Sequence, residues 1–392
     1  MVRDISIAMF GFWVLITALI GCDGIQKVVT PGKGVVPEST HTVKIGFLAS
    51  GSRVTYPNGG QIAVAEINAD GGLLGMPIEL VTEVGILTPE AAVEAASRMI
   101  LDDDIVALVG PNRSAHAIPV GAVAQQHSIP MITTTATNPN VTSAGDFVFM
   151  AAFTDSFQGN VMARFAKEDL KLTTAALLTR SGEVYTEGIS EFFLTNFTDV
   201  GGIIAANVFY EEGTTDFTEH LTEIAAAMPE ALFVSGLSEE TTLIVQQARA
   251  LPLQNAAGEP LLFLGTDAWD NPDLLMNEAR HIEGSFFSGH FSAATDQPSG
   301  KAFVETYQAV YGELPIGGHA VSYDAVQLLF AAIARSGSLE GEAIRAELAT
   351  TENYTGATPI ASYDENRHPT KSAVIFTIKN GEKQFHKQID PF

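Results

Sequence analysis

The stretch Gly110–Thr142, GPNRSAHAIPVGAVAQQHSIPMITTTATNPNVT, decides the fold. It follows the apolar run Ile105–Val109, contains a helix-like apolar pattern, and returns to an apolar run at Ile129–Ile132. This order predicts strand, loop, helix, strand and loop, which is one βαβ unit. In an open parallel sheet, ligands bind beside the loops that follow the carboxyl ends of the strands. Ser114 and the loop Thr133–Thr137 are therefore candidate binding loops, unless their hydroxyls only cap the following helices.

Strand-like and helix-like segments alternate along most of the chain. Before the central stretch they are Val43–Leu48, Ile62–Ile67 with a stop at Gly71-Gly72, Pro77–Val81 and Ala91–Leu101; after it they are Ala175–Leu178, Glu187–Phe197, Ile203–Tyr210, Phe217–Met228, Leu232–Val234, Glu239–Ala250, Leu261–Leu264, Asp273–Glu278, Phe303–Tyr311, Tyr323–Ser336 and a hairpin turning at Asn380-Gly381. Such alternation predicts an α/β fold with mainly parallel sheets flanked by helices. Because the pattern forms two blocks, before and after about residue 155, we expect two similar lobes.

Composition excludes several classes of protein. The chain has 392 residues, of which 46% are apolar and 17% charged, as expected for a packed globular protein with room for two domains. The net charge of −25 argues against nucleic acid and anionic membrane surfaces as partners, because both require a basic patch. One cysteine excludes internal disulfides and cysteine-rich metal sites. No nucleophile elbow, zinc-protease motif or phosphate-binding loop occurs, so we expect neither catalysis nor a cofactor or metal.

The amino-terminal segment has the pattern of an export signal. An apolar run at residues 5–20 follows Arg3 and ends in Leu19-Ile20-Gly21-Cys22. It is shorter than the roughly 20 residues that span a bilayer, which favours a signal peptide over residues 1–21. Leu19 and Gly21 before Cys22 resemble the lipobox of bacterial lipoproteins, which implies that Cys22 is lipidated. The alternative is an ordinary signal peptide with an incidental cysteine. Proline and glycine within residues 22–41 predict a flexible tether.

Six short motifs follow one another across nearly the whole mature chain. They are Ala65–Gly72, Val109–Pro111, Ile129–Ile132 with Ala136–Pro139, Tyr185–Gly188, Thr215–Phe217 and Tyr323–Ala325. In this order they resemble periplasmic binding proteins of the leucine/isoleucine/valine type, the solute receptors of branched-chain amino acid ABC transporters. The resemblance implies a type I fold in which three crossings join two lobes. The expected lobes are 42–153 with 289–366 and 156–286 with 370–392.

The resemblance also implies which residues bind the ligand. They are Ser114, Thr135, Ala136 and Thr137 in the first lobe, and Tyr185 and Asp267 in the second. Hydroxyls and free backbone N–H groups near helix starts suit a carboxylate, which assigns Ser114 and Thr137 to that group. Asp267 matches the family's acid for an ammonium group. The alternative is that Asp267 caps the helix near Asp273 or is a surface acid.

Some positions depart from the family pattern. Leu237 stands where the family has an aromatic residue that contacts the ligand carboxylate. Asn112 and Arg113 stand where leucine-type receptors are apolar, so these three residues are candidate specificity positions. Whether Arg53 or Tyr56 reaches the cleft is left open. The ligand is therefore a branched-chain amino acid, one with a polar side chain, or a smaller amino-acid-like metabolite.

The function implied by the resemblance is solute binding outside the cytoplasm. We expect a monomer that binds a small amino acid ligand between its lobes and delivers it to ABC permease subunits. Its contact with the membrane is expected only through the lipid on Cys22. One alternative is a receptor of the same fold that signals to a membrane partner. A hydrolase is a further alternative, against which stands the lack of a nucleophile–base pair.

Overall fold

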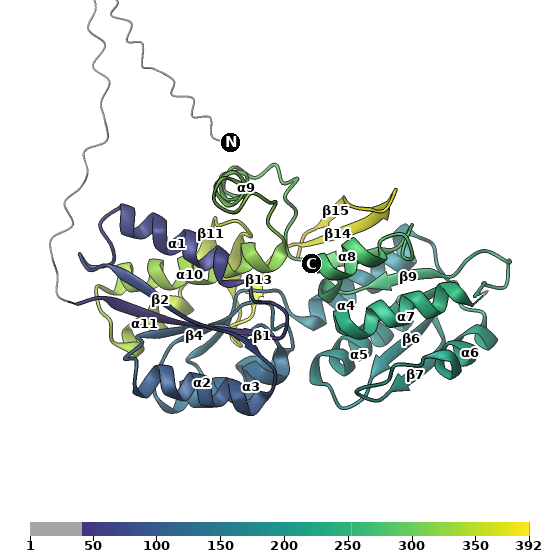
Figure 1. The fold of residues 1–392 in the computed structure, drawn as a ribbon, viewed down its shortest axis with the longest axis horizontal. Helices are drawn as coiled ribbons and strands as arrows, with labels where there is room; N and C mark the ends of the chain where they lie inside the picture. The colour runs from purple at the N-terminus through teal and green to yellow at the C-terminus, as the bar shows by residue number, and fades with distance from the viewer. Residues whose placement is uncertain (1–40, 252, 392) are drawn as a thin grey trace, which may run out of the picture. The chain divides into compact units, whose positions relative to one another are not determined.

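The two blocks of alternating elements form two separate sheets (Figure 1). The structure is a computed structural model and describes residues 41–251 and 253–391. The first sheet has the strand order β2-β1-β3-β4-β5, and all neighbouring strands are parallel. Its strands are β1 (Val43–Ser50), β2 (Ile78–Ile86), β3 (Ala107–Val109), β4 (Met131–Thr133) and β5 (Val148–Met150). The predicted central βαβ unit is therefore β3, a helix and β4.

The second sheet has the strand order β15-β14-β10-β9-β8-β6-β7. The strands from β7 to β10 are parallel, whereas β14 and β15 are antiparallel to their neighbours. Its strands are β6 (Thr174–Arg180), β7 (Ile203–Tyr210), β8 (Ala231–Val234), β9 (Leu262–Gly265), β10 (Phe286–Gly289), β14 (Ala373–Lys379) and β15 (Glu382–Ile389). The predicted hairpin is β14–β15, where Asn380 and Gly381 have φ of 58° and 73° as a type I′ turn requires.

Helices flank both sheets. In the first half they are α1 (Pro57–Ala69), α2 (Pro89–Leu101) and α3 (Ser114–Gln126); in the second sheet's half they are α4 (Asp155–Arg164), α5 (Val184–Asp199), α6 (Thr218–Ala227), α7 (Ser238–Ala250) and α8 (Pro272–Glu278); α9 (Pro298–Tyr311), α10 (Gly317–Ser336) and α11 (Gly341–Ala349) follow. Figure 1 shows α1 and α10 on one face of the first sheet and α2 and α3 on the other. We call the first sheet with α1–α3, α10 and α11 lobe 1, and the second sheet with α4–α8 lobe 2.

Three segments, 151–154, 290–297 and 371–372, connect the two lobes. The predicted α/β architecture, with two lobes, mainly parallel sheets and three crossings, is confirmed. A small antiparallel sheet that the sequence pattern did not indicate precedes the third crossing. Its strands are β11 (Glu352–Tyr354), β12 (Ile360–Tyr363) and β13 (Pro369–Thr370).

Buried polar groups tie two of the crossings together. Lys371, on the third crossing, donates to Ala151 O on the first crossing at 2.8 Å and to Thr358 Oγ1 at 2.7 Å. Thr358 in turn donates its backbone N–H and its hydroxyl to the carboxylate of Asp324 on α10. Burial lowers the pKa of Lys371 to about 8, and the negative charge of Asp324 opposes this shift. This network fixes the paths of the first and third crossings, residues 151–154 and 371–372, which we call the hinge.

Two glycines bring α1 and α10 into close contact. A Cβ on Gly59 would lie 1.9 Å from His319 O, and a Cβ on Gly318 would lie 2.1 Å from the Tyr56 ring. No larger residue fits at either position without moving a helix. This contact places the loop between β1 and α1, including Tyr56, against the start of α10.

The neutral imidazole of His319 stabilises the first turn of α10. Its Nδ1 accepts from the backbone N–H of Ile316 at 3.3 Å, so Nε2 carries the proton and lies 3.1 Å from Thr55 Oγ1. Burial lowers the pKa of His319 to about 4. A proton on Nδ1 would replace this accepted hydrogen bond with a repulsion between two N–H groups.

We expect His319 to make the fold sensitive to acid. Because its pKa is depressed in the folded chain, its contribution to stability is complete above pH 6.5 and is lost as the pH falls towards about 4. The loss amounts to at most about 1.4 kcal/mol per pH unit. In His319→Asn, Oδ1 can accept the same N–H bond without titrating. Urea unfolding at several pH values should therefore show a shallower acid loss for the variant, and parallel curves would contradict this role.

The amino-terminal expectations lie outside the described residues. The signal peptide, the lipidated Cys22 and almost all of the tether fall within residues 1–40. In the part of the chain that the structure describes, no helix is long and apolar enough to cross a membrane.

Candidate ligand-binding site

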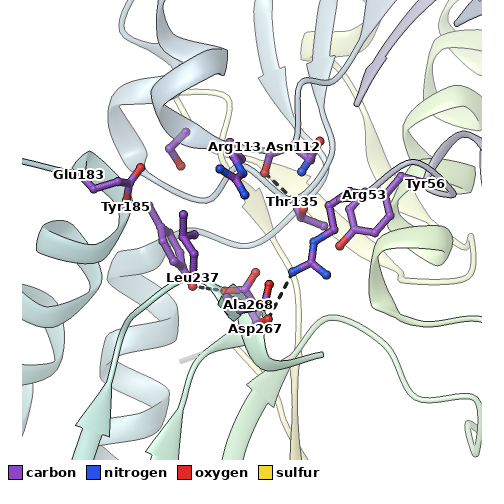
Figure 2. Close-up of a pocket in the computed structure, with 12 residues that line it drawn as sticks. Arg53, Tyr56, Asn112, Arg113, Thr135, Glu183, Tyr185, Leu237, Asp267 and Ala268 are labelled. Atoms are coloured by element: carbon purple, nitrogen blue, oxygen red, sulfur yellow. Dashed lines mark hydrogen bonds between the residues drawn. The ribbon is translucent and has the colours of Figure 1, made fainter. Parts of the chain in front are cut away.

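A pocket lies where loops at the carboxyl ends of strands from both sheets meet (Figure 2). Lobe 1 contributes Arg53, Tyr56, Asn112, Arg113, Ser114 and Thr135, and lobe 2 contributes Glu183, Tyr185, Leu237, Ser238, Asp267 and Ala268. The cavity has a volume of about 50 Å³. Ligand crevices of open α/β sheets occur at this edge of the strands.

The loop after β3 is shaped by Gly110 and locked by Asn112. Gly110 has φ of 85°, and a Cβ there would lie 2.2 Å from Leu48 O, so only glycine fits. The side-chain oxygen of Asn112 accepts from Ser50 N at 2.6 Å. The Asn112 carbonyl accepts from the Thr135 hydroxyl at 3.4 Å. Asn112 therefore lines the pocket mainly as a brace between the loops after β1, β3 and β4.

Ser114 is the first residue of α3 and lies in the pocket wall. Its Oγ accepts from Asn138 N at 3.2 Å, which leaves its hydroxyl proton for another acceptor. The residue before it, Arg113, makes no side-chain cap to α3. The backbone N–H groups of the first turn of α3 and the Ser114 hydroxyl therefore form a donor group suited to an anion.

Ala136 and Thr137 do not line the pocket, although the sequence pattern grouped them with Thr135. Both are buried, at 1% and 0% exposure. The Thr137 carbonyl accepts from Asp155 N at 2.7 Å. Burial raises the pKa of Asp155 well above its usual range. Thr137 thus supports the base of the first crossing, and a role for it on the ligand stays a prediction.

Asp267 is held by donors from three elements. Gln158 Nε2 and the Tyr185 hydroxyl donate to Oδ1 at 2.9 and 2.8 Å, and His290 Nε2 lies 3.1 Å from Oδ2. Gln158 also accepts the backbone N–H of Asp267 at 2.9 Å. The alternative role as a helix cap does not apply to α8, because Asn271 accepts from Asp273 N there.

These contacts keep Asp267 ionised. Burial by itself would raise the pKa of Asp267, but the hydrogen bond and charge of His290 and the bonds from Gln158 and Tyr185 outweigh it and lower the pKa below its usual range. Burial and the nearby Asp267 raise the pKa of Tyr185 well above its ordinary value, so Tyr185 keeps its proton and donates. The pocket therefore contains a buried negative charge that is fixed in position.

Four lining residues were not assigned from the sequence: Arg53, Tyr56, Glu183 and Ser238. Glu183 caps α5 by accepting from Thr186 N at 2.9 Å, and burial raises its pKa, with that hydrogen bond opposing. A cap before the Tyr185 motif was a signal that could have located Glu183. Ser238 is the first residue of α7, and the start of α7 has no side-chain cap. Ser114 has the same place at the start of α3.

The two lobes make direct polar contacts around the pocket. Arg53 donates to Ala268 O at 3.3 Å, as Figure 2 shows, and Asn138 donates to Val184 O at 2.9 Å. Close by, Asp270 accepts from Gly317 N at the start of α10 at 2.9 Å. The η3 turn (Asp267–Trp269) therefore carries the pocket acid and one of the contacts between the lobes on adjacent residues.

The pocket presents charged and polar groups from both lobes. Among the described residues, no group of three or more His, Cys, Asp or Glu side chains is arranged to hold a metal ion. The pocket offers a fixed carboxylate on the lobe 2 side, and a hydroxyl and helix N–H groups on the lobe 1 side. This arrangement can hold a small molecule that carries an ammonium group and a carboxylate.

Known proteins share this sequence and fold. A profile described as periplasmic binding protein matches residues 42–383. The Leu/Ile/Val-binding protein BraC3 of Rhizobium johnstonii is 29% identical over 313 residues, which are 79% of this chain and 82% of that protein. A leucine-, isoleucine-, valine-, threonine- and alanine-binding protein of Pseudomonas aeruginosa is 26% identical over 309 residues, 78% of this chain and 80% of the other.

Two solved structures extend the comparison. A leucine-binding protein from Thermotoga maritima is 34% identical, has a TM-score of 0.82, and is matched over 89% of this chain and 99% of its own. The branched-chain amino acid transporter substrate-binding protein of Streptococcus pneumoniae, solved with isoleucine, is 29% identical with a TM-score of 0.81, over 90% and 100% of the two chains.

Proposed function

Because the chain belongs to the periplasmic binding protein family, we propose that it captures a free amino acid between its two lobes and delivers it to an ABC transporter. Family membership places the protein outside the cytoplasm. Relatives named for leucine, isoleucine, valine, threonine and alanine binding support an amino acid as the ligand. The transporter role of the Streptococcus pneumoniae protein supports delivery to a permease over signalling.

The observation that carries the proposal is the separation of charge-binding groups across the pocket. Asp267 presents a buried, ionised carboxylate from lobe 2, which suits the ammonium group of an amino acid. Ser114 and the uncapped start of α3 face the pocket from lobe 1, which suits the carboxylate. A zwitterion therefore contacts both lobes at once, and binding favours the state in which the lobes are together.

A thermal-shift screen tests the proposal. The soluble form that starts at residue 23 is heated with each of the common amino acids and with small carboxylates that lack an amino group. A ligand present at 100 times its dissociation constant adds about 2.7 kcal/mol to the free energy of unfolding, which is a clear shift. If no amino acid raises the unfolding temperature, the proposal is wrong.

Ser114 provides a local check. Ser114→Ala removes a hydrogen bond to the ligand carboxylate, which costs roughly 1.5–3 kcal/mol and weakens binding about 10- to 100-fold. It also leaves the Asn138 N–H without its partner, so part of the effect is a lower free energy of unfolding. Calorimetry with the amino acid found in the screen measures the affinity. Ser143→Ala, an exposed serine of the same lobe, is the control, and equal affinities in both variants would remove Ser114 from the site.

Anchoring to the membrane forms part of the same proposal. The Leu19-Ile20-Gly21-Cys22 sequence supports a lipid on Cys22, which would keep the receptor near its permease. Both lobes that line the pocket belong to one chain, so binding needs no second copy, which supports the proposal of a monomer. Detergent partitioning of the parent and Cys22→Ser proteins tests the anchor, because only the parent should enter the detergent phase.

A further inference from the structure

Two guanidinium groups line the pocket in addition to the groups that suit an amino acid's ends. Figure 2 shows that Arg53 and Arg113 both enter from the lobe 1 side. Arg53 donates to the uncharged carbonyl of Ala268 and lies 5.7 Å from the centroid of the Tyr56 ring. No acid among the described residues forms an ion pair with Arg53. Its positive charge is therefore available to a ligand.

Arg113 is only weakly neutralised. Among the residues that the structure describes, its one ion pair is with Glu239 at 3.6 Å, and the Glu239 side chain is 57% exposed. Ion pairs with such an exposed partner contribute little. The guanidinium packs against Gly51, where a Cβ would lie 2.7 Å from Nη2, so a larger residue at Gly51 would displace it. The backbone at Gly51 thus holds Arg113 at the edge of the pocket.

Among the described residues, neither acid that lines the pocket forms an ion pair with Arg53 or Arg113. Asp267 already accepts from Gln158 and Tyr185 and contacts His290, and its remaining lone pairs suit one ammonium group. Glu183 is engaged with the backbone of α5. An α-amino acid brings one positive and one negative group, which Asp267 and the start of α3 satisfy. Arg53 then has no carboxylate partner and Arg113 has only the exposed Glu239 at 3.6 Å, so both guanidinium groups can bind a further carboxylate from the ligand.

The lining is also unsuited to a branched aliphatic side chain. Leu237 and Ala268 are the only aliphatic residues of the twelve that line the pocket. A ligand side chain that enters the pocket lies next to Arg53 and Arg113, because both line it. Arginine binds a carboxylate through two parallel N–H bonds, which gives both strength and geometry.

We propose that the ligand is an acidic amino acid, whose side-chain carboxylate binds Arg53 and Arg113. This inference rests on the proposed function, since it assigns the ammonium group to Asp267 and the α-carboxylate to the start of α3. It differs from the ligands named for the relatives, and the difference arises from the two arginines and from the scarcity of aliphatic lining.

Calorimetry on the soluble receptor tests the inference with matched pairs of ligands. L-glutamate and L-aspartate are compared with their neutral isosteres L-glutamine and L-asparagine, with L-leucine, and with glutarate, which lacks the amino group. At least one acidic amino acid should bind about 100-fold or more tightly than its amide, because the amide cannot pair with a guanidinium. Leucine binding more tightly than both acids would overturn the inference and leave the proposed function standing.

Arginine variants locate the effect. Arg53→Gln and Arg113→Gln should each reduce the acid-to-amide affinity ratio about 10- to 100-fold, as for a lost bond to a charged group. The ratio is informative because loss of the Arg53 contact with Ala268 would weaken both ligands alike. Arg335→Gln, an exposed arginine of lobe 1 paired with Glu347, is the control and should leave the ratio unchanged. An unchanged ratio in both pocket variants would overturn the assignment.

Two further outcomes distinguish a failure of this inference from a failure of the proposed function. Glutarate bound as tightly as L-glutamate would show that the ammonium contact with Asp267 is absent, which contradicts the proposed function. A failure of every amino acid to bind would remove both proposals together.

Discussion

Replacing Asp267 by Asn is expected to weaken amino acid binding about 30- to 4,000-fold, the equivalent of 2–5 kcal/mol for a charge pair that loses one partner in a closed site. The carboxylate is buried and ionised, and its Oδ1 and Oδ2 are fixed by Gln158, Tyr185 and His290. Without that charge, the ammonium group of the ligand is buried against a neutral amide.

The variant is expected to fold because its neighbours can adapt. With Asn Oδ1 in the place of Asp267 Oδ1, the bonds from Gln158 and Tyr185 remain. The Asn Nδ2 then faces His290 Nε2. His290 Nδ1 has no hydrogen-bond partner among the described residues, so in the variant the imidazole can carry its proton on Nδ1 alone and accept at Nε2.

Calorimetry on two ligands separates the role of the charge from damage to the site. Asp267→Asn should lose most affinity for the amino acid and little for the analogue without the amino group. Asp273→Asn removes the same charge from an exposed position at the start of α8 and should bind like the parent. If Asp267→Asn binds the amino acid as tightly as the parent does, Asp267 is not the partner of an ammonium group.

Asp324→Ala is expected to cause the largest loss of stability, about 3–5 kcal/mol, because it removes one member of a buried charged network. Asp324 is fully buried and accepts from the Tyr354 hydroxyl, from the backbone N–H groups of Ala357 and Thr358, and from the Thr358 hydroxyl. The alanine variant leaves these donors unsatisfied and leaves Lys371 without its nearby negative charge.

Urea unfolding of three variants tests the hinge network. Asp324→Ala should unfold at the lowest urea concentration and Asp324→Asn at an intermediate one, because an amide oxygen replaces only some of the accepted bonds. Asp364→Ala is the control: Asp364 accepts two backbone N–H groups in an exposed turn, so its loss should cost less. A midpoint for Asp324→Ala equal to that of the parent would show that the network does not hold the hinge.

The two pocket acids illustrate how far residue spacing predicts a site. Asp267 and Glu183 both follow strands at their carboxyl ends, and topology alone brings such positions to one edge. Asp267 was predicted because its loop matches a family position, whereas Glu183 has no such match and lies next to Tyr185 at the start of α5. Residue spacing did not predict the groups that hold Asp267, because Gln158 and His290 lie 109 and 23 residues away in the chain.

The sequence by itself determined the features that local periodicity and loop composition encode. These are the alternating strands and helices, the turn at Asn380-Gly381, and the strand-end loops with Ser114, Thr135, Tyr185 and Asp267. Only the tertiary structure decided where individual side chains of those loops point. Asn112 turns to Ser50, Thr137 lies beneath the pocket against Asp155, and Arg53 reaches Ala268 on the other lobe. The physical reason is that side-chain directions in loops follow from backbone angles and from packing against residues distant in the chain. The spacing of residues along the sequence records neither the backbone angles of the loops nor this packing.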